Sequence, residues 1–91
     1  MFSWLNKQGV RSTEGFDVQG TGRFTIEYRE RGRVITVNVE PGIQGGPCVA
    51  IDENAFERWD GSSTLNPSGE QARLLKNFKE AMAFQGVPVC T

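Results

Sequence analysis

The strongest constraint on the fold is a pair of alternating stretches in the first half of the chain. Residues 24–29 read FTIEYR and residues 34–40 read VITVNVE, so that apolar and polar residues alternate in each stretch. A period of two places the apolar side chains on one face of a β-strand and the polar ones on the other. The two stretches are joined by a link of about four or five residues that contains Gly32, and they therefore predict an antiparallel hairpin with one solvated face.

Shorter stretches extend this hairpin. Residues 15–20 (GFDVQG) alternate between glycines, and residues 48–52 (CVAID) form an apolar run after a loop of Gly and Pro at 43–47. Both stretches are typical of short strands, and the second would continue the meander. At the start of the chain, Phe2 and Leu5 are three positions apart, which predicts one helical turn docked on the domain. Alternatively, Phe2 and its neighbour Trp4 belong to a partner or dimer surface.

An apolar stripe predicts one long helix near the C-terminus. Its members recur at helical spacing and are Leu74, Leu75, Phe78, Ala81, Met82 and, as the one polar position, Gln85. Asn66 with Pro67, or alternatively Ser68 with Gln71, would cap its start, and Gly86 would end it. We expect the stripe to be buried on the hairpin and third strand. The predicted fold class is α+β, with a small antiparallel β-meander of three or four strands packed against one long C-terminal helix.

Length and charge limit the classes of protein to which the chain can belong. A chain of 91 residues predicts a single domain, 1–91, in which 1–14 form a docked or mobile N-terminal segment. Ten Lys and Arg against eleven Asp and Glu give a net charge of −1, which argues against a general binder of nucleic acids or membrane surfaces. The absence of histidine excludes Ser–His and Cys–His nucleophiles and histidine metal ligands.

Cys48 and Cys90 are too few for a disulfide framework, and whether they pair stays open. Two cysteines without histidine do not make a zinc site. The first residues lack a signal-peptide pattern, and no apolar run reaches the ~18 residues of a membrane span. These features predict a cytoplasmic protein with reduced thiols.

Two charged clusters are candidates for contacts with other molecules. The first comprises Arg29, Arg31 and Arg33 at the predicted hairpin tip, with Arg23 nearby in the sequence. Because Glu27 and Glu30 dilute this charge, we expect a solvated hairpin end and no nucleic-acid contact.

The second cluster is an acidic stretch that surrounds a tryptophan, and it supplies the candidate partner-binding residues Asp52, Glu53, Glu57, Trp59 and Asp60. The stretch lacks the glycine-centred spacing of a calcium loop and shows no sign of a general acid–base pair. It could instead attract a basic partner. Trp59 and Phe56, three positions apart, would share one buried face of a short turn of helix, although a half-exposed Trp59 would be an interface anchor.

The order of these parts resembles a known family. The strand FTIEY at 24–28 leads to a Gly-Arg turn, a second strand ends at Glu40, and VAI at 49–51 runs into Trp59-Asp60. The helix RLLKNF at 73–78 continues to AFQG at 83–86. Over residues 24–86, this pattern resembles the immunity protein family numbered seventy-four of bacterial polymorphic toxin systems.

The resemblance implies a small cytoplasmic antidote that binds and neutralises a cognate bacterial toxin domain, with no catalytic, cofactor or metal residues to assign. We therefore expect a non-enzymatic protein-binding module that uses no cofactor, whose partner is a toxin protein and neither a nucleic acid nor a membrane. The alternative hypothesis is a homo-oligomeric structural or accessory domain that associates through its exposed apolar N-terminus. A small enzyme or metal binder would have to rely on the acidic stretch or on Cys48.

Overall fold

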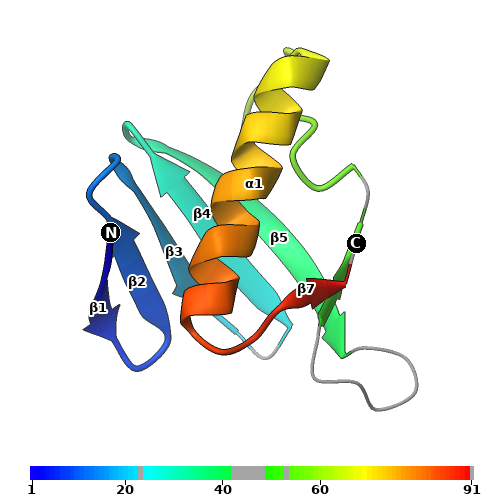
Figure 1. Cartoon of the computed structure of the whole chain (residues 1–91). Coiled ribbons are helices and arrows are strands. Elements are labelled where there is room, and N and C mark those ends of the chain that lie inside the picture. The colour runs from blue at the N-terminus through cyan, green and yellow to red at the C-terminus, as the bar shows by residue number, and fades with distance from the viewer. Residues whose placement is uncertain (23, 42–48, 53, 91) are drawn as a thin grey trace.

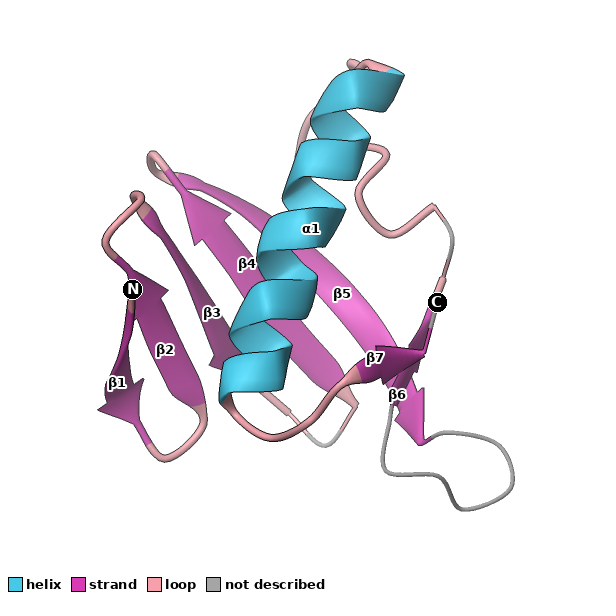
Figure 2. Cartoon of the chain, in the orientation of Figure 1, coloured by secondary structure: helices cyan, strands magenta, loops and turns pink. Residues whose placement is uncertain are grey.

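A computed structural model describes residues 1–22, 24–41, 49–52 and 54–90, which form one sheet and one helix (Figure 1). Within these residues there are seven strands and one α-helix, in the order β1 (Phe2–Asn6), β2 (Gly9–Ser12), β3 (Phe16–Gly20), β4 (Thr25–Glu30), β5 (Arg33–Pro41), β6 (Val49–Ile51), α1 (Ser68–Phe84) and β7 (Val89–Cys90). The helix lies across one face of the sheet, as Figure 2 shows.

The strands lie in the sheet in the order in which they occur in the sequence. Each neighbouring pair from β1 to β6 is antiparallel, and β7 joins β6 in parallel after the helix. The α+β class and the antiparallel meander with a C-terminal helix are confirmed, but the expected count of three or four strands is too low. The additional strands lie mainly at the two ends of the chain, where short segments gain their ladders from partners that sequence periodicity does not reveal.

The turn between β4 and β5 consists of only two residues, Arg31 and Gly32, with φ angles of 53° and 77°. Two positive φ angles in a two-residue link define a turn whose twist matches that of the flanking strands. The link is therefore shorter than predicted. Arg31 adopts a left-handed conformation, which is costly for a residue with a Cβ atom, whereas Gly32 adopts it without a steric penalty.

The N-terminal segment is a β-hairpin, so the predicted helical turn is wrong. Phe2 faces Ser12 and Trp4 faces Val10, but the register shifts between Trp4 and Asn6. Leu5 occupies this irregularity. The three-residue spacing between Phe2 and Leu5 therefore spans an irregular strand and does not mark one face of a helix.

The helix Ser68–Phe84 buries the predicted stripe, with Leu74, Phe78, Ala81 and Met82 in the core. Its side chains hydrogen-bond to β4 and share one core with residues of β4 and β5, as expected, and its backbone also comes close to β2, β3 and β7. Pro67 occupies the N-cap position without a side-chain capping bond, and both predicted caps are therefore wrong. The predicted stop is confirmed, because Gly86 follows the helix with a φ of 81°.

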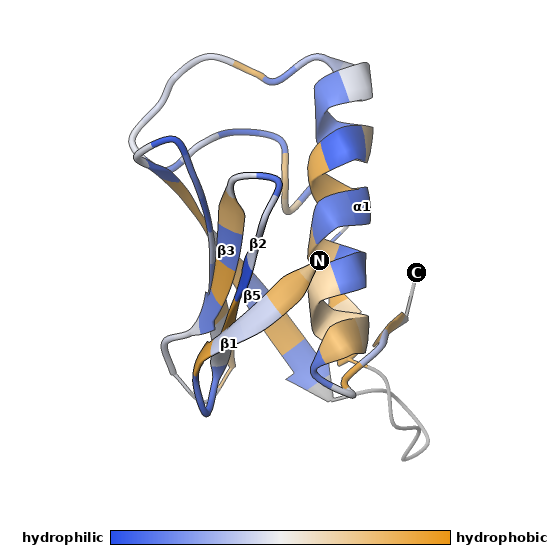
Figure 3. Ribbon diagram, turned by 60° about the vertical axis from the view of Figure 1, so that its left-hand side comes forward, coloured by the Kyte–Doolittle hydropathy of each residue, from blue (hydrophilic) through white to orange (hydrophobic). Residues whose placement is uncertain are grey.

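Aromatic residues fill the space between the helix and the central strands. Tyr28, on β4, has its ring 5.9 Å from that of Phe56 and 6.2 Å from that of Trp59. Phe56 in turn contacts Phe78 of the helix at 5.4 Å. Phe56 and Trp59 are 3% and 5% exposed, so both are buried as predicted, but Phe56 lies in a turn and Trp59 in an irregular segment instead of a helix. Figure 3 shows the sheet and the helix as two separate layers.

Some predictions concern residues outside the described ranges. These are the loop of Gly and Pro at 43–47, the pairing of Cys48 with Cys90, and the positions of Arg23 and Glu53. Within the described part of the chain, no helix combines the length and the apolar character that crossing a membrane requires.

Candidate functional site

The helix covers one face of the sheet and leaves the other face open. Cross-strand partners on this open face form two rows, because residues that face each other in an antiparallel ladder point to the same side. The first row runs through Ser3, Arg11, Asp17, Arg29 and Val34, and the second through Gly9, Gln19, Glu27 and Thr36. The open face is thus almost entirely polar.

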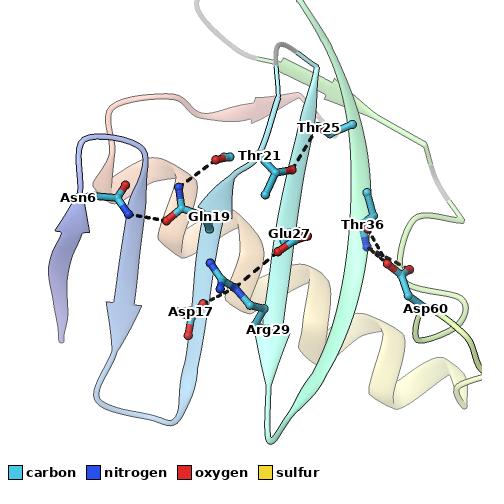
Figure 4. A network of polar contacts seen from close by, with 10 residues as sticks. Asn6, Asp17, Gln19, Thr21, Thr25, Glu27, Arg29, Thr36 and Asp60 are labelled. Carbon is cyan, nitrogen blue, oxygen red and sulfur yellow. Dashed lines mark hydrogen bonds and ion pairs between the residues drawn. The ribbon is translucent and has the colours of Figure 1, made fainter.

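Opposite charges alternate across the centre of the open face (Figure 4). The Nε of Arg29 lies 2.9 Å from Oδ1 of Asp17 and 3.8 Å from Oε1 of Glu27. Arg11 faces Asp17 from the opposite side, on β2. The side chains of Asp17, Glu27 and Arg29 are 22%, 33% and 39% exposed, so these charges offset one another in side chains that still reach the solvent in part.

Amides and hydroxyls continue this polar surface toward β1 and toward the connection between β3 and β4. Asn6 donates to Oε1 of Gln19 at 2.7 Å, and Nε2 of Gln19 donates to the carbonyl oxygen of Gly20 at 2.9 Å. Thr21 donates to the hydroxyl of Thr25 at 3.2 Å. These bonds restrict the orientations of the four side chains that form them.

Asp60, a predicted partner-binding residue, also has a structural task at the edge of β5. Its carboxylate accepts the backbone N–H of Thr36 at 3.1 Å from each oxygen and the Thr36 hydroxyl at 2.5 Å. The backbone N–H of Asp60 donates to the carbonyl oxygen of Val34 at 2.8 Å. The residue thereby takes the place of a neighbouring strand where β6 does not reach, and its charge remains on the exposed side of the sheet.

Two further carboxylates lie further along the sheet, one on β5 and one directly after β6. Glu40 faces Ala50 in the ladder with β6, and Asp52 follows β6 directly, opposite Asn38 in the same register. A hollow of about 520 Å³ is lined by Asn38, Glu40 and Asp52 together with residues of β6. We call Glu40, Asp52 and Asp60 the acidic rim. Sequence reasoning found Asp52 and Asp60 but did not include Glu40, which only the pairing of β5 with β6 brings to them.

The other predicted residues lie elsewhere. Trp59 is 5% exposed, and the guanidinium of Arg33 covers its ring at 4.2 Å, so Trp59 is a core aromatic and not an exposed interface anchor. Glu57 is half-buried and forms a 3.9 Å ion pair with Arg58. The structure therefore brings Asp52 and Asp60 to the acidic rim and separates Trp59 from them.

The arginines near the hairpin tip do not form one patch. Arg29 is paired on the open face, Arg31 lies in the turn itself, and Arg33 stacks on Trp59 at the other side. Alternation along the strands sends successive side chains to opposite faces, which separates residues that are close in the sequence.

A buried polar cluster joins β4 to the helix, and sequence reasoning missed it. Glu30 is only 6% exposed, and its two oxygens accept the two terminal nitrogens of Arg73 at 3.1 Å each. The Tyr28 hydroxyl donates to Glu30 at 3.0 Å and accepts from Asn77 at 3.1 Å. The only signal in the sequence was the polar residue Glu30, which stands at a core-facing position of an alternating strand.

This cluster shifts the protonation of its members in directions that follow from its geometry. Burial is the largest influence on the Tyr28 hydroxyl and raises its pKa, and the nearby Glu30 carboxylate acts in the same direction. At the exposed end of the cluster, the hydrogen bond from Arg73 lowers the pKa of Glu70. Every polar atom named here has a hydrogen-bond partner, so the cluster stabilises the packing of the helix on the sheet.

Among the described residues, no group of three or more Cys, Asp or Glu side chains has the arrangement needed to hold a metal ion. Comparisons of the chain with protein-family models, with curated proteins and with solved structures find no match.

Proposed function

We propose that this chain is a cytoplasmic, non-enzymatic binding module that neutralises a cognate bacterial toxin domain by covering it. The observation that carries the proposal is the one-sided architecture of the sheet. The helix and the core occupy one face, and the other presents accessible polar side chains that are already held by cross-strand partners. A prearranged surface of this kind loses little side-chain entropy on binding. The resemblance to an immunity protein family supplies the class of partner.

The acidic rim indicates which surface of the toxin would be bound. Within the described residues, neither Glu40 nor Asp52 is in an ion pair, and both are exposed. Unpaired carboxylates along one side of an otherwise charge-matched face favour a partner with a basic patch, such as a toxin that acts on nucleic acid. Such charges accelerate association and exclude partners of the same sign.

The proposal is tested by searching the genes that adjoin this one for a toxin-like gene and purifying the protein that such a gene encodes. We expect a complex at micromolar concentrations or tighter, measured by calorimetry. The double variant Glu40→Lys, Asp52→Lys should bind at least about tenfold more weakly, mainly through slower association, and the loss should shrink at high salt. Asp60 is left unchanged because it also caps β5.

The matched control reverses two exposed carboxylates away from the rim, Glu14→Lys and Glu80→Lys. This variant has the same net charge as the rim variant and should bind like the wild-type chain. Equal loss in both variants would assign the effect to net charge and remove the rim from the proposal. The absence of any complex at micromolar concentrations would overturn the binding function itself.

A further inference from the structure

Among the described residues, no strand pairs with the outer edge of β1, which is the first strand of the sheet. Thr13 N–H donates to the carbonyl of Met1 at 2.9 Å, which fixes the alternation of the β1–β2 ladder. Because hydrogen-bonded and non-hydrogen-bonded pairs alternate, Ser3 faces β2 with its backbone groups, whereas those of Phe2 and Trp4 point outward. The outer edge of β1 therefore offers the backbone donors and acceptors of two residues to another strand.

The same edge carries the largest exposed aromatic cluster of the described chain. The ring of Phe84, at the end of α1, lies 5.5 Å from that of Phe2 and 5.6 Å from that of Trp4. Trp4 and Phe84 nevertheless remain 54% and 43% exposed. Their rings project on the helix side of β1, beside the free backbone groups, so a strand added at this edge would cover them as well.

We propose that the β1 edge pairs with the β1 edge of a second copy of this chain, in an antiparallel arrangement about a two-fold axis at Ser3. In this register Phe2 of one copy exchanges main-chain hydrogen bonds with Trp4 of the other, and the reverse pair does the same. The aromatic clusters of the two copies then lie next to each other across the axis. The arrangement is isologous and therefore closes as a dimer.

Charge favours a second copy as the occupant of this edge. Strand β1 reads FSWLN and contains no charged residue or proline, which are the usual devices that keep edge strands apart. Antiparallel pairing also brings the β1–β2 turn, which carries Lys7, toward the partner's β2–β3 turn, which carries Glu14. The Met1 ammonium lies at that end too but donates to the Thr13 hydroxyl at 3.1 Å. The bulge at Leu5 ends the regular edge, so the pairing stays short.

Disulfide trapping tests the register directly. Across the two-fold axis the two Ser3 residues form a non-hydrogen-bonded pair, whose Cα atoms lie about 4.5 Å apart, a separation that a disulfide can span. Ser3→Cys in the full chain with Cys48→Ser and Cys90→Ser should therefore yield a disulfide-linked dimer on mild oxidation. Arg11→Cys in the same background places an equally exposed thiol one strand further from the axis, and should not cross-link.

A second experiment measures association without a cross-link. Sedimentation of the wild-type chain over a concentration series should show a mass that rises from 10.1 kDa toward twice that value. Ser3→Lys places two like charges opposite each other at the axis and should weaken the dimer about tenfold or more without lowering the melting temperature. A wild-type chain that stays monomeric at millimolar concentration, or equal cross-linking of the two cysteine variants, would overturn the proposal. Toxin binding through the acidic rim does not depend on this edge, so either proposal can fail alone.

Discussion

Tyr28 is the only tyrosine of the chain, so its ionisation can be followed by ultraviolet absorbance without interference from another residue. Burial raises its pKa above the ordinary value of about 10. We predict that the folded chain shows no tyrosinate absorbance at the pH where an exposed tyrosine ionises. The absorbance change should appear only at higher pH, together with the loss of near-ultraviolet circular dichroism that marks unfolding.

The direction of the accompanying stability change follows from proton linkage. Above pH ~10 the unfolded chain has lost the Tyr28 proton while the folded chain retains it, so the folded state binds more protons. The free energy of unfolding should therefore fall as the pH rises above ~10 and be independent of Tyr28 below it. In Tyr28→Phe this part of the alkaline slope should disappear. An ordinary tyrosine titration in the folded chain would contradict the burial of the hydroxyl.

Glu30 provides a second prediction at the level of single residues. Glu30→Gln puts an amide where a carboxylate now accepts bonds from Arg73 and Tyr28, and it leaves Arg73 without its buried counter-charge. We expect the free energy of unfolding to fall by about 2 kcal/mol, measured by urea denaturation. Glu70→Gln is the matched control, since Glu70 contacts the same arginine near the surface. This substitution should lower the free energy of unfolding by at most about 0.5 kcal/mol. Equal losses would contradict the central role of Glu30.

Residue type and spacing predicted part of the candidate site. Asp52 and Asp60 could be found because their charges cluster in the sequence, but Glu40 joins them only through the β5–β6 pairing. Trp59 was ambiguous, since its acidic neighbours say nothing about which way the ring points, and Arg33 from another strand covers it. Contacts between distant segments decided each of these cases, and such contacts leave no local pattern.

At the scale of elements, the segment after β6 stabilises the first half of β5, which does not pair with β6. Asp60→Ala removes the acceptor of the Thr36 N–H and hydroxyl, and we predict a loss of about 1–2 kcal/mol in the free energy of unfolding. Asp60→Asn keeps one carbonyl oxygen as an acceptor, so the free energy of unfolding should fall less than in Asp60→Ala. Glu57→Ala, which removes only a 3.9 Å surface ion pair, is the control and should be nearly neutral. If all three variants are equally stable, Asp60 does not cap this edge.

The elements differed in how well the sequence predicted them, for physical reasons. Strands β4 and β5 and the helix are long enough to show their period clearly, and all three form where their patterns place them. In strand β1, Phe2 and Trp4 alternate as in a regular strand, but Leu5 lies in the bulge and interrupts the period of two in the sequence. Strand β7 consists of two residues and exists because β6 is there to pair with it, so no local signal could identify it.

At the scale of the whole molecule, a continuous series of aromatic rings joins the edge strand to the far side of the core. From Trp4 it passes to Phe84, Phe2, Phe16, Tyr28 and Trp59, with successive ring centroids between 5.4 and 6.2 Å apart. Each of these pairs contributes about 0.5–1.5 kcal/mol beyond the burial of its surface. Because the series crosses from β1 through the helix end to β4, we expect the N-terminal hairpin to unfold with the rest of the domain.

Two single-tryptophan variants test this expectation. Trp59→Phe leaves only Trp4 as a fluorescent reporter of the edge, and Trp4→Phe leaves only Trp59 as a reporter of the core. In each variant the fluorescence midpoint in urea should coincide with the midpoint measured by far-ultraviolet circular dichroism, as all-or-none unfolding requires. Phe16→Ala, which interrupts the series at a 3% exposed position, should lower both midpoints through a loss of about 3–5 kcal/mol. If Trp4 reported an earlier transition than circular dichroism, the hairpin would be a separate unit, and the aromatic contacts at Phe84 would not couple it to the core.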